Sequence, residues 1–382
     1  MRVSWRVTTL ALATPLRIAR GSMAAREAVE VVLTDADGVQ GHGEVVTSVR
    51  LGLDVAGIVR ALADSRPALA AARDGEQVLA VLAAAPPPAG VRAALDAAAH
   101  DLLGVRAGCP VYALFGNGAA GGTSRSGVPV PGGGAVAEHA GGAALSEAGA
   151  LDGAAPGGAE TPGGGWQSGA VAPGGAAARR PGGGRPTGTF APVPTARTIG
   201  IGAPLEAAGQ AKRLWESGFR VLKVKAGDPA DVERLAAVRT AAPDATVIAD
   251  ANGGWTAERA VRTLNHLPWL AAAEQPVPPG TPETLAWVSE RSPVPVIADE
   301  DAATVADIQA LAGAVAGVNV KLAECGGLEP ARAMIAAAER SGLEIMLGCL
   351  VASSLGIAPA VHLTPRARWA DLDGHLLLAA DP

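Results

Sequence analysis

The chain has 382 residues, enough for more than one domain. Its net charge of −6, from 31 Lys and Arg against 37 Asp and Glu, gives no reason to expect a nucleic acid or an anionic membrane as a partner. Three scattered cysteines, Cys109, Cys325 and Cys349, fit a reducing compartment better than a disulfide framework. The N-terminus lacks the apolar segment of a signal peptide, and no apolar run reaches the ~20 residues of a membrane helix, so we expect a cytoplasmic protein.

Residues 1–116 are expected to form an α+β domain that precedes the rest of the fold. The alternating apolar patterns predict an antiparallel meander followed by helices, with strands at Arg2–Ala13, Ala28–Thr34 and Val39–Val46. A loop is expected at Thr14–Ser22 between the first two strands, and a second at Thr47–Gly52 after the third. Each loop contains an arginine, Arg20 or Arg50, which is either a solvated charge or a group that meets a ligand.

Residues 117–192 differ in composition from everything around them. This stretch holds 23 glycines between Gly118 and Gly188, many alanines and prolines, and no lysine, isoleucine or tyrosine. Such a segment cannot bury enough apolar surface to offset the entropy lost on ordering. We interpret it as a disordered insertion or linker, with an interaction segment or a lid as the alternative.

Residues 193–382 alternate short apolar runs with helical segments, which is typical of a parallel α/β barrel of the (β/α)8 type. Five successive runs end in charged residues, with steps of 25, 24, 25 and 22 residues between Lys225, Asp250, Glu274, Asp299 and Lys321. In such barrels the chemistry lies at the C-terminal ends of the strands. The strand-end charges therefore indicate a single functional site.

Two pairs of charged residues are spaced two apart, Lys223 with Lys225 and Asp371 with Asp373. In a strand, positions i and i+2 point to the same face, so each pair is expected to address one space. Taken alone, the lysines could protect an edge strand, and the acids could be a solvated turn. The other strand-end charges favour a functional role for the lysine pair.

Asp250, Glu274 and Asp299 end three adjacent predicted strands, so we expect them to converge. Oxygen ligands without histidine or cysteine suit a hard cation such as Mg²⁺, which keeps positions open for water or substrate. None of the six histidines has metal-type spacing, which argues against a histidine-ligated zinc site.

Lys225 and Lys321 end the second and sixth strands of eight, and therefore should face each other across the barrel mouth. Two opposed bases and a Lewis acid can remove a proton from one face of a carbon and return it to the other. That carbon must lie α to a carboxylate whose oxygens bind the metal, so that the enolate is stabilised. A lysine base must be partly neutral, which the nearby Lys223 and the metal charge would favour.

These motifs together resemble the muconate-lactonising branch of the enolase superfamily. The motifs are Lys-x-Lys, Asp-x-Asn, Glu-Gln-Pro, Ala-Asp-Glu and Asn-x-Lys-Leu followed by Gly-Gly. The Ile-Ala-Arg-Gly-Ser of residues 18–22, the run Met346–Leu350 and Asp371-Leu-Asp373-Gly are similar to the dipeptide epimerases of that branch. The resemblance covers residues 1–116 and 195–378, and implies an isomerase that acts on L-Ala-D/L-Glu in cell-wall peptide turnover.

The resemblance also implies roles for individual residues. Mg²⁺ would be held by Asp250, Glu274 and Asp299, and the acid/base pair would be Lys225 and Lys321 with Lys223 in support. The paired acids Asp371 and Asp373 would hold the α-ammonium of the dipeptide, because paired carboxylates suit an ammonium. Arg20 would meet the acidic side chain of the epimerised residue. Asn252 and Glu300 would lie next to the metal-binding carboxylates and help to orient them.

Three residues depart from the pattern of that family: Asp301 stands where serine is usual, Glu324 where lysine or threonine is common, and His375 where proline is frequent. Within the superfamily, an o-succinylbenzoate synthase or an N-acylamino-acid racemase is the alternative, although neither needs an ammonium site. A non-catalytic protein that binds a partner through its glycine-rich insertion is the alternative of another class. The expected partner is a small dipeptide rather than a nucleic acid or a membrane, and homo-oligomerisation is left open.

Overall fold

The computed structural model describes residues 1–115, 193–280 and 282–382. The predicted insertion at residues 117–192 lies entirely outside the described residues. Within these ranges, no helix is long and apolar enough to cross a membrane.

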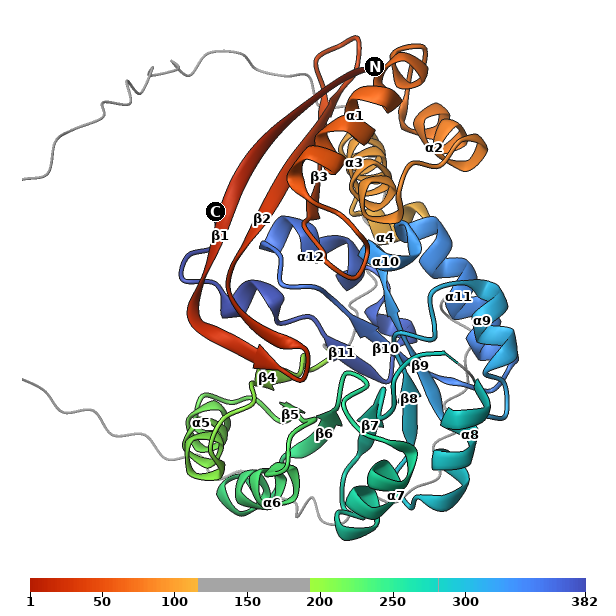
Figure 1. The fold of residues 1–382 in the computed structure, drawn as a ribbon. Helices are drawn as coiled ribbons and strands as arrows, with labels where there is room; N and C mark the ends of the chain where they lie inside the picture. The colour runs from red at the N-terminus through yellow and green to blue at the C-terminus, as the bar shows by residue number, and fades with distance from the viewer. Residues whose placement is uncertain (116–192, 281) are drawn as a thin grey trace, which may run out of the picture. The chain divides into compact units, whose positions relative to one another are not determined.

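The N-terminal sheet has three antiparallel strands in the order β1-β2-β3 (Figure 1), with bounds Arg2–Ile18, Gly21–Thr34 and Gln40–Val46. The predicted loop at Thr14–Ser22 is wrong for most of its length, because β1 continues to Ile18 and β2 begins at Gly21. A register shift between Ala11 and Leu16 interrupts the ladder, and pairing then resumes down to Ile18 opposite Gly21. The β1–β2 hairpin is therefore long and ends in a tight turn at residues 19–20.

Four helices follow this sheet, α1 (Val55–Ala70), α2 (Gly75–Ala84), α3 (Ala89–Ala107) and α4 (Val111–Leu114). The sheet packs against α3 at very short range. A Cβ atom added at Gly43 would lie 2.1 Å from the carbonyl oxygen of Ala94, so only glycine permits this approach. The apolar side chains between them, including Val29, Val31 and Leu95, are fully buried.

The second part of the fold is the predicted parallel barrel, which is confirmed. Its strands are β4 (Arg197–Ile199), β5 (Val221–Lys225), β6 (Thr246–Asp250), β7 (Ala272–Glu274), β8 (Val296–Ala298), β9 (Gly317–Lys321), β10 (Glu344–Gly348) and β11 (Trp369–Asp371). They are hydrogen-bonded in sequence order, and a parallel bridge between Thr195 and Ala370 joins the two ends of the sheet. Large side chains such as Ile248, Met346 and Trp369 fill the interior, so the barrel is a packed core.

Helices cover the outside of the barrel and connect successive strands (Figure 1). They are α5 (Pro204–Glu216), α6 (Asp231–Ala241), α7 (Ala257–His266), α8 (Pro282–Arg291), α9 (Val305–Ala310), α11 (Leu328–Arg340) and α12 (Ser354–Val361), with the short α10 (Leu322–Cys325) and two 3-10 turns at Thr364–Arg366 and Gly374–Leu377. A strand followed by a helix, repeated around the ring, places every strand's C-terminal end at one mouth.

Hydrogen bonds join the N-terminal domain to this mouth. Asp96 of α3 accepts from the backbone N–H of Leu328 at 2.7 Å, and Glu44 of β3 accepts from the backbone and hydroxyl of Ser353. The carbonyl of Arg17 accepts from the N–H of Ile201 at 2.8 Å. These contacts hold the β1–β2 hairpin over the strand ends.

Candidate active site

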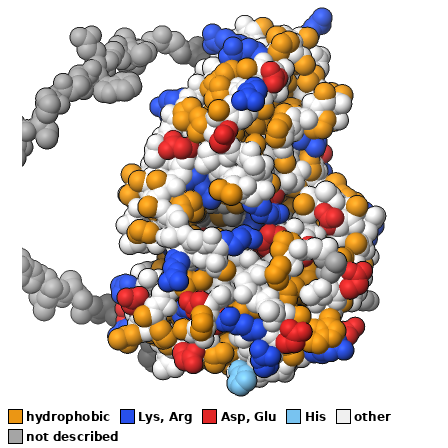
Figure 2. All heavy atoms as spheres, in the orientation of Figure 1, with side chains coloured by type: hydrophobic (Ala, Val, Ile, Leu, Met, Phe, Trp, Pro, Cys, Tyr) orange, Lys and Arg blue, Asp and Glu red, His pale blue; other side chains and the backbone are white. Residues whose placement is uncertain are grey.

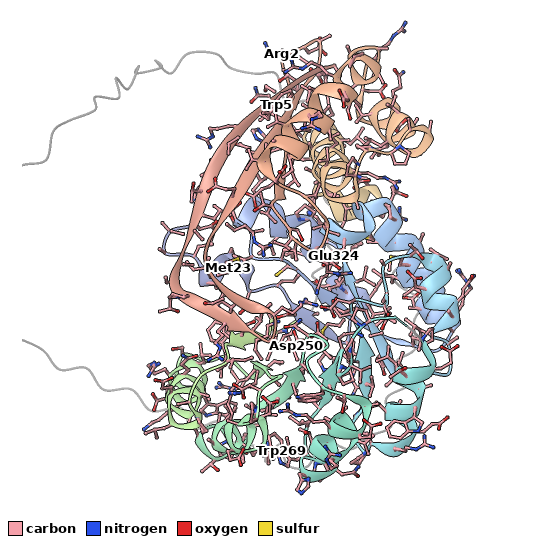
Figure 3. All side chains as sticks on the ribbon, viewed as in Figure 1. Arg2, Trp5, Met23, Asp250, Trp269 and Glu324 are labelled. Carbon is pink, nitrogen blue, oxygen red and sulfur yellow. The ribbon has the colours of Figure 1, made fainter. Side chains whose placement is uncertain are left out.

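A cavity of about 1370 Å³ lies between the β1–β2 hairpin and the C-terminal ends of the barrel strands. Its walls come from residues 16–27 and 47–56 of the N-terminal domain and from the ends of β5, β9, β10 and β11. Figure 2 shows a hollow in this region with Lys and Arg side chains gathered around it. Figure 3 places Met23 on the hairpin and Asp250 and Glu324 at the barrel end that faces it.

Lys223 is buried beneath the cavity among three carboxylates. Its Nζ lies 2.6 Å from Glu274 Oε2, 2.6 Å from Asp371 Oδ2 and 2.9 Å from Asp250 Oδ2, and the side chain is 2% exposed. Burial disfavours the ammonium, but the surrounding carboxylates outweigh it and hold the pKa of Lys223 well above its usual value. Lys223 is therefore a fixed positive charge that holds three strand ends together.

Lys225 and Lys321 reach the cavity from strands β5 and β9, four places apart in the ring. Lys225 Nζ donates to Asp250 Oδ2 at 2.5 Å, and Lys321 Nζ donates to Asp299 Oδ2 at the same distance. Burial works against the charge of Lys321, but Asp299 outweighs it and raises the pKa of that ammonium. Each lysine thus contacts one carboxylate from the predicted metal set.

The three carboxylates of that set are almost completely buried at the ends of β6 and β7 and just beyond β8. Asp250 is opposite Glu274 in the strand register. Burial opposes its charge, but Lys223 and Lys225 hold the pKa of Asp250 far below its usual range. Burial and the neighbouring Asp250 raise the pKa of Glu274 to about 7, and burial also raises the pKa of Asp299. The site therefore holds more buried negative charge than the lysines compensate.

The donor chemistry of these residues fits a hard divalent cation. All three side chains offer carboxylate oxygens. Oε2 of Glu274 contacts the ammonium of Lys223 at 2.6 Å, and Oδ1 of Asp299 is buried without a hydrogen-bond partner among the described residues. As they stand, no three His, Cys, Asp or Glu side chains in the described ranges are grouped closely enough to be a metal centre. The carboxylates contact lysine ammonium groups instead: Asp250 and Glu274 contact Lys223, and Asp299 contacts Lys321.

Two buried amides also belong to this site, and our sequence reasoning did not assign them a role. Asn319 Nδ2 donates to Glu274 Oε1 at 2.8 Å, and Gln275 Oε1 accepts from the backbone N–H of Asp299 at 2.9 Å. Both lie in the quoted motifs, Asn319 two positions before Lys321 on the same strand face. Gln275 and the predicted support residue Asn252 have φ of 34° and 45°, an uncommon conformation that accumulates at functional sites. These amides orient the carboxylates.

Asn252 contacts both Lys225 and Asp250. Its backbone N–H donates to Asp250 Oδ1 at 2.9 Å, and its Oδ1 accepts from Lys225 Nζ at 3.2 Å.

Asp371 ends β11, whereas Asp373 lies two residues beyond it, so the predicted shared strand face does not extend to Asp373. Both acids line the same cavity, but both have partners. Asp371 contacts Lys223, and Asp373 Oδ2 accepts from Arg197 at 3.0 Å and from the backbone N–H of Thr198 at 2.7 Å. Burial nevertheless raises the pKa of Asp373. Oδ1 of Asp371 is buried without a hydrogen-bond partner, so it remains available to a ligand donor.

Arg20, in the β1–β2 turn, and Arg50, in the loop after β3, both form ion pairs with residues of the barrel. Arg20 donates to Glu300 at 2.6 Å, and Arg50 donates to Glu324 at 2.5 Å. The unusual Glu324 thus has a cationic partner. The second unusual acid, Asp301, accepts from Gln275 Nε2 and from the backbone N–H of Gly280 instead of facing the cavity freely.

Comparison with known protein families agrees with this geometry. Residues 2–116 match the N-terminal domain of the mandelate racemase / muconate lactonizing enzyme family, and residues 206–375 match the family described as enolase C-terminal domain-like. The chain therefore belongs to the enolase superfamily, as the strand-end motifs predicted.

Relatives of this chain carry related names. An L-Ala-D/L-Glu epimerase of Escherichia coli strain K12 is 41% identical over 189 residues, which are 49% of this chain and 58% of that protein. An N-acetyl-D-glutamate racemase of a Pseudoalteromonas species is 39% identical over 189 residues, with the same two coverages. The chain thus spans 58% of the length of each of these two curated relatives.

One similar solved structure contains Mg and a dipeptide. It is a dipeptide epimerase from Methylococcus capsulatus complexed with Mg and the dipeptide L-Arg-D-Lys. It is 27% identical, with a TM-score of 0.74, and the match covers 100% of this chain and 92% of that one.

Proposed function

We propose that this protein is a Mg²⁺-dependent dipeptide epimerase that inverts the carbon α to the carboxylate, with L-Ala-D/L-Glu as the leading substrate. The observation that carries the proposal is the placement of Lys225 and Lys321 on strands four apart in the ring, both opening on one cavity. Names of relatives that act on dipeptides support the same reaction class.

In this proposal the two lysines move the proton. One takes it from the α-carbon, and the other returns a proton to the opposite face, so the configuration inverts. Lys223 stays charged and keeps the strand ends in place. Each base must first give up its contact with Asp250 or Asp299, so the reaction requires another positive charge at those carboxylates.

The side chains that would hold this cation are Asp250, Glu274 and Asp299. When bound there, Mg²⁺ supplies the positive charge that stabilises the enolate of the substrate carboxylate. Asn252 and Glu300 would help to position these carboxylates, Asn252 through its contact with Lys225 and Glu300 through its contact with Arg20.

The substrate ends would be recognised at opposite walls of the cavity. Asp371 and Asp373 would hold the α-ammonium, and Arg20 would lie over the epimerised residue from the hairpin turn. We further propose that residues 1–116 form a capping domain, 117–192 a linker and 193–382 the catalytic barrel, and that the enzyme works on cell-wall peptides in the cytoplasm.

A second candidate is racemisation of N-acylamino acids, which the Pseudoalteromonas relative's name supports. The structural observation in its favour is the pairing of Asp373 with Arg197, because an ammonium would have to compete with a guanidinium already present. Oδ1 of Asp371 has no such competitor, which favours the free dipeptide.

A library screen in D₂O separates the two candidates. The purified full chain with Mg²⁺ is incubated with dipeptides and with their N-acetylated counterparts, and mass spectrometry and chiral analysis follow deuterium uptake and inversion. Faster turnover of the free dipeptides supports the epimerase, whereas preference for the acetylated forms supports the racemase. Unchanged activity in excess EDTA would contradict metal dependence.

A further inference from the structure

Six basic side chains line the cavity, and five of them have a carboxylate partner. These five side chains form seven ion pairs: Lys223 with Asp250, Glu274 and Asp371; Lys225 with Asp250; Lys321 with Asp299; Arg20 with Glu300; and Arg50 with Glu324. The sixth is Arg26 on β2, for which the described residues provide no carboxylate partner. This arginine has no role in the proposed reaction so far.

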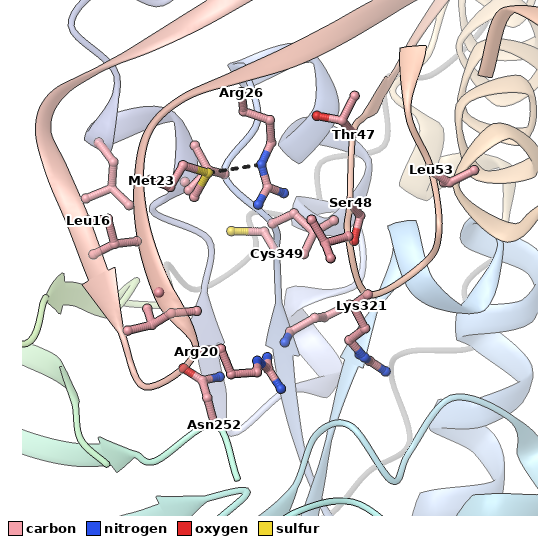
Figure 4. Close-up of a pocket in the computed structure, with 18 of the residues that line it drawn as sticks. Leu16, Arg20, Met23, Arg26, Thr47, Ser48, Leu53, Asn252, Lys321 and Cys349 are labelled. Atoms are coloured by element: carbon pink, nitrogen blue, oxygen red, sulfur yellow. Dashed lines mark hydrogen bonds between the residues drawn. The ribbon is translucent and has the colours of Figure 1, made fainter. Parts of the chain in front are cut away.

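The surroundings of Arg26 are almost apolar. Among the described residues, its Nε donates only to the thioether sulfur of Met23 at 3.4 Å, and its Nη1 is buried without a hydrogen-bond partner. In Figure 4 the side chain extends from the hairpin into the cavity toward Cys349, while Arg20 and Lys321 lie lower in the same view. The guanidinium therefore faces the space that a substrate would fill.

An unpaired guanidinium in such a place is costly. Burying a charge without a partner costs free energy that a hydrogen-bonded anion offsets. Burial accordingly lowers the pKa of Arg26, although the group stays charged near neutral pH because arginine is so strongly basic. Thioether sulfur is a weak acceptor, so Met23 does not satisfy the guanidinium. A carboxylate would do so with two parallel hydrogen bonds.

We infer that Arg26 is a specificity-determining residue that binds a second carboxylate of the substrate, remote from the reacting carbon. The inference rests on the proposed function, because the first carboxylate is the one next to the inverted carbon. An acidic side chain on either residue of the dipeptide has this chemistry. The inference differs from the sequence-based expectation, in which Arg20 meets the acidic side chain.

The contrast between the two arginines supports this assignment. Arg20 already lies 2.6 Å from Glu300, whose side chain is 2% exposed, so a substrate carboxylate would compete with a buried acid. Arg26 has no such competitor. A substrate carboxylate gains more at the arginine whose charge is uncompensated.

The test compares matched acidic and amide dipeptides on each variant. With Mg²⁺ present, kcat/KM is measured for L-Ala-L-Glu against L-Ala-L-Gln and for L-Glu-L-Ala against L-Gln-L-Ala. The wild type should prefer the acidic member of at least one pair, and Arg26→Met should reduce that preference by about 10-fold or more. Arg26→Lys, which restores a positive charge, should recover part of it. The acidic-to-amide ratio of kcat/KM is calculated separately for each variant. A loss of activity that affects both substrates equally therefore leaves the ratio unchanged.

Arg6→Met is the matched control, since Arg6 lies on the same sheet, pairs with Glu30 and is not part of the cavity wall. It should keep the wild-type ratios. The pair that responds to Arg26→Met identifies which residue carries the carboxylate. The assignment is overturned if neither ratio changes, or if Arg20→Gln removes the preference while Arg26→Met does not.

Calorimetric binding of the same four dipeptides separates this inference from the proposed function. If no variant epimerises any of them but the wild type still binds the acidic member more tightly than Arg26→Met does, the proposed reaction fails and the role of Arg26 stands. If the wild type epimerises them and binding of acidic and amide members is equally affected by Arg26→Met, the reaction stands and the role of Arg26 fails.

Discussion

The two walls of the cavity hold their positive charges in different ways. On the barrel side, lysines stand at the ends of short parallel strands, and Lys223 is 2% exposed among buried carboxylates. On the hairpin side, the arginines extend from a long two-stranded ribbon, and the Arg20 side chain is 47% exposed. A buried side chain among charged partners loses most of its rotamer freedom, whereas an exposed side chain keeps more of it. The barrel wall therefore suits the proton chemistry, and the hairpin wall suits the choice of substrate.

If the barrel wall carries the chemistry, the largest effect should follow the loss of one of its carboxylates. Glu274→Gln removes a buried charge that contacts Lys223 and accepts from Asn319. Activity should fall by at least about 100-fold to 1000-fold, the scale seen when one group that stabilises developing charge is removed. Added Mg²⁺ should raise the melting temperature of the wild type but not that of this variant. Glu283→Gln, at an exposed position on α8, is the control and should behave as the wild type does.

A smaller and more selective loss of substrate binding is expected when the two acids at the end of β11 and just beyond it are removed. Removing both acids, Asp371→Asn with Asp373→Asn, should weaken binding of free dipeptides more than of N-acetylated ones. Each lost charge-assisted hydrogen bond is worth roughly 1.5–3 kcal/mol. The measurement is KM or calorimetric affinity for matched substrate pairs, with the exposed Asp244→Asn as control. Equal weakening of both substrate forms would show that these acids do not hold the ammonium.

The smallest effect should come from the contact that seats the N-terminal domain on the barrel. His100 is buried, with Nδ1 2.9 Å from the Asp96 carbonyl oxygen and 3.3 Å from its carboxylate. Burial opposes protonation, but Asp96 outweighs it and raises the pKa of His100. A raised pKa in the folded state means that the charged imidazole stabilises folding below the unfolded-state pKa, and that this stability is lost as pH rises through the folded-state pKa.

Between about pH 6 and about pH 8, the melting temperature of the wild type should therefore fall relative to that of His100→Gln. His266→Gln, at an exposed position on α7, is the matched control and should follow the wild-type curve. Parallel curves for the wild type and His100→Gln would mean that the charge of His100 does not support the domain contact.

The barrel wall was largely predictable from the sequence, and the hairpin wall was not. Lys225, Asp250 and Lys321 end strands that are set by apolar runs and a regular spacing, so local pattern fixed their place at one mouth. The hairpin's length depends on pairing across a register shift between Ala11 and Leu16, which no local pattern encodes. Which arginine lacks a partner depends on contacts such as Arg20 with Glu300, 280 residues away in the chain.

The spacing of the carboxylates could not be read from the sequence either. Strand ends predict that Asp250, Glu274 and Asp299 lie near one another. Their final positions depend on which ammonium groups they contact, and those contacts join residues far apart in the chain. Only the three-dimensional arrangement shows that the lysines reach those oxygens.

The central claim is that Lys225 and Lys321 act on opposite faces of one carbon, and proton exchange in D₂O tests it most directly. Each pure epimer is incubated with Lys321→Ala, and proton NMR follows loss of the α signal while chiral analysis follows configuration. One epimer should exchange its α-proton with retention, because Lys225 can remove the proton and return a deuteron to the same face, and the other epimer should be inert. Lys225→Ala should give the mirror-image pattern. Interconversion of the epimers by Lys321→Ala at a near wild-type rate, or exchange of the same epimer by both variants, would contradict the account.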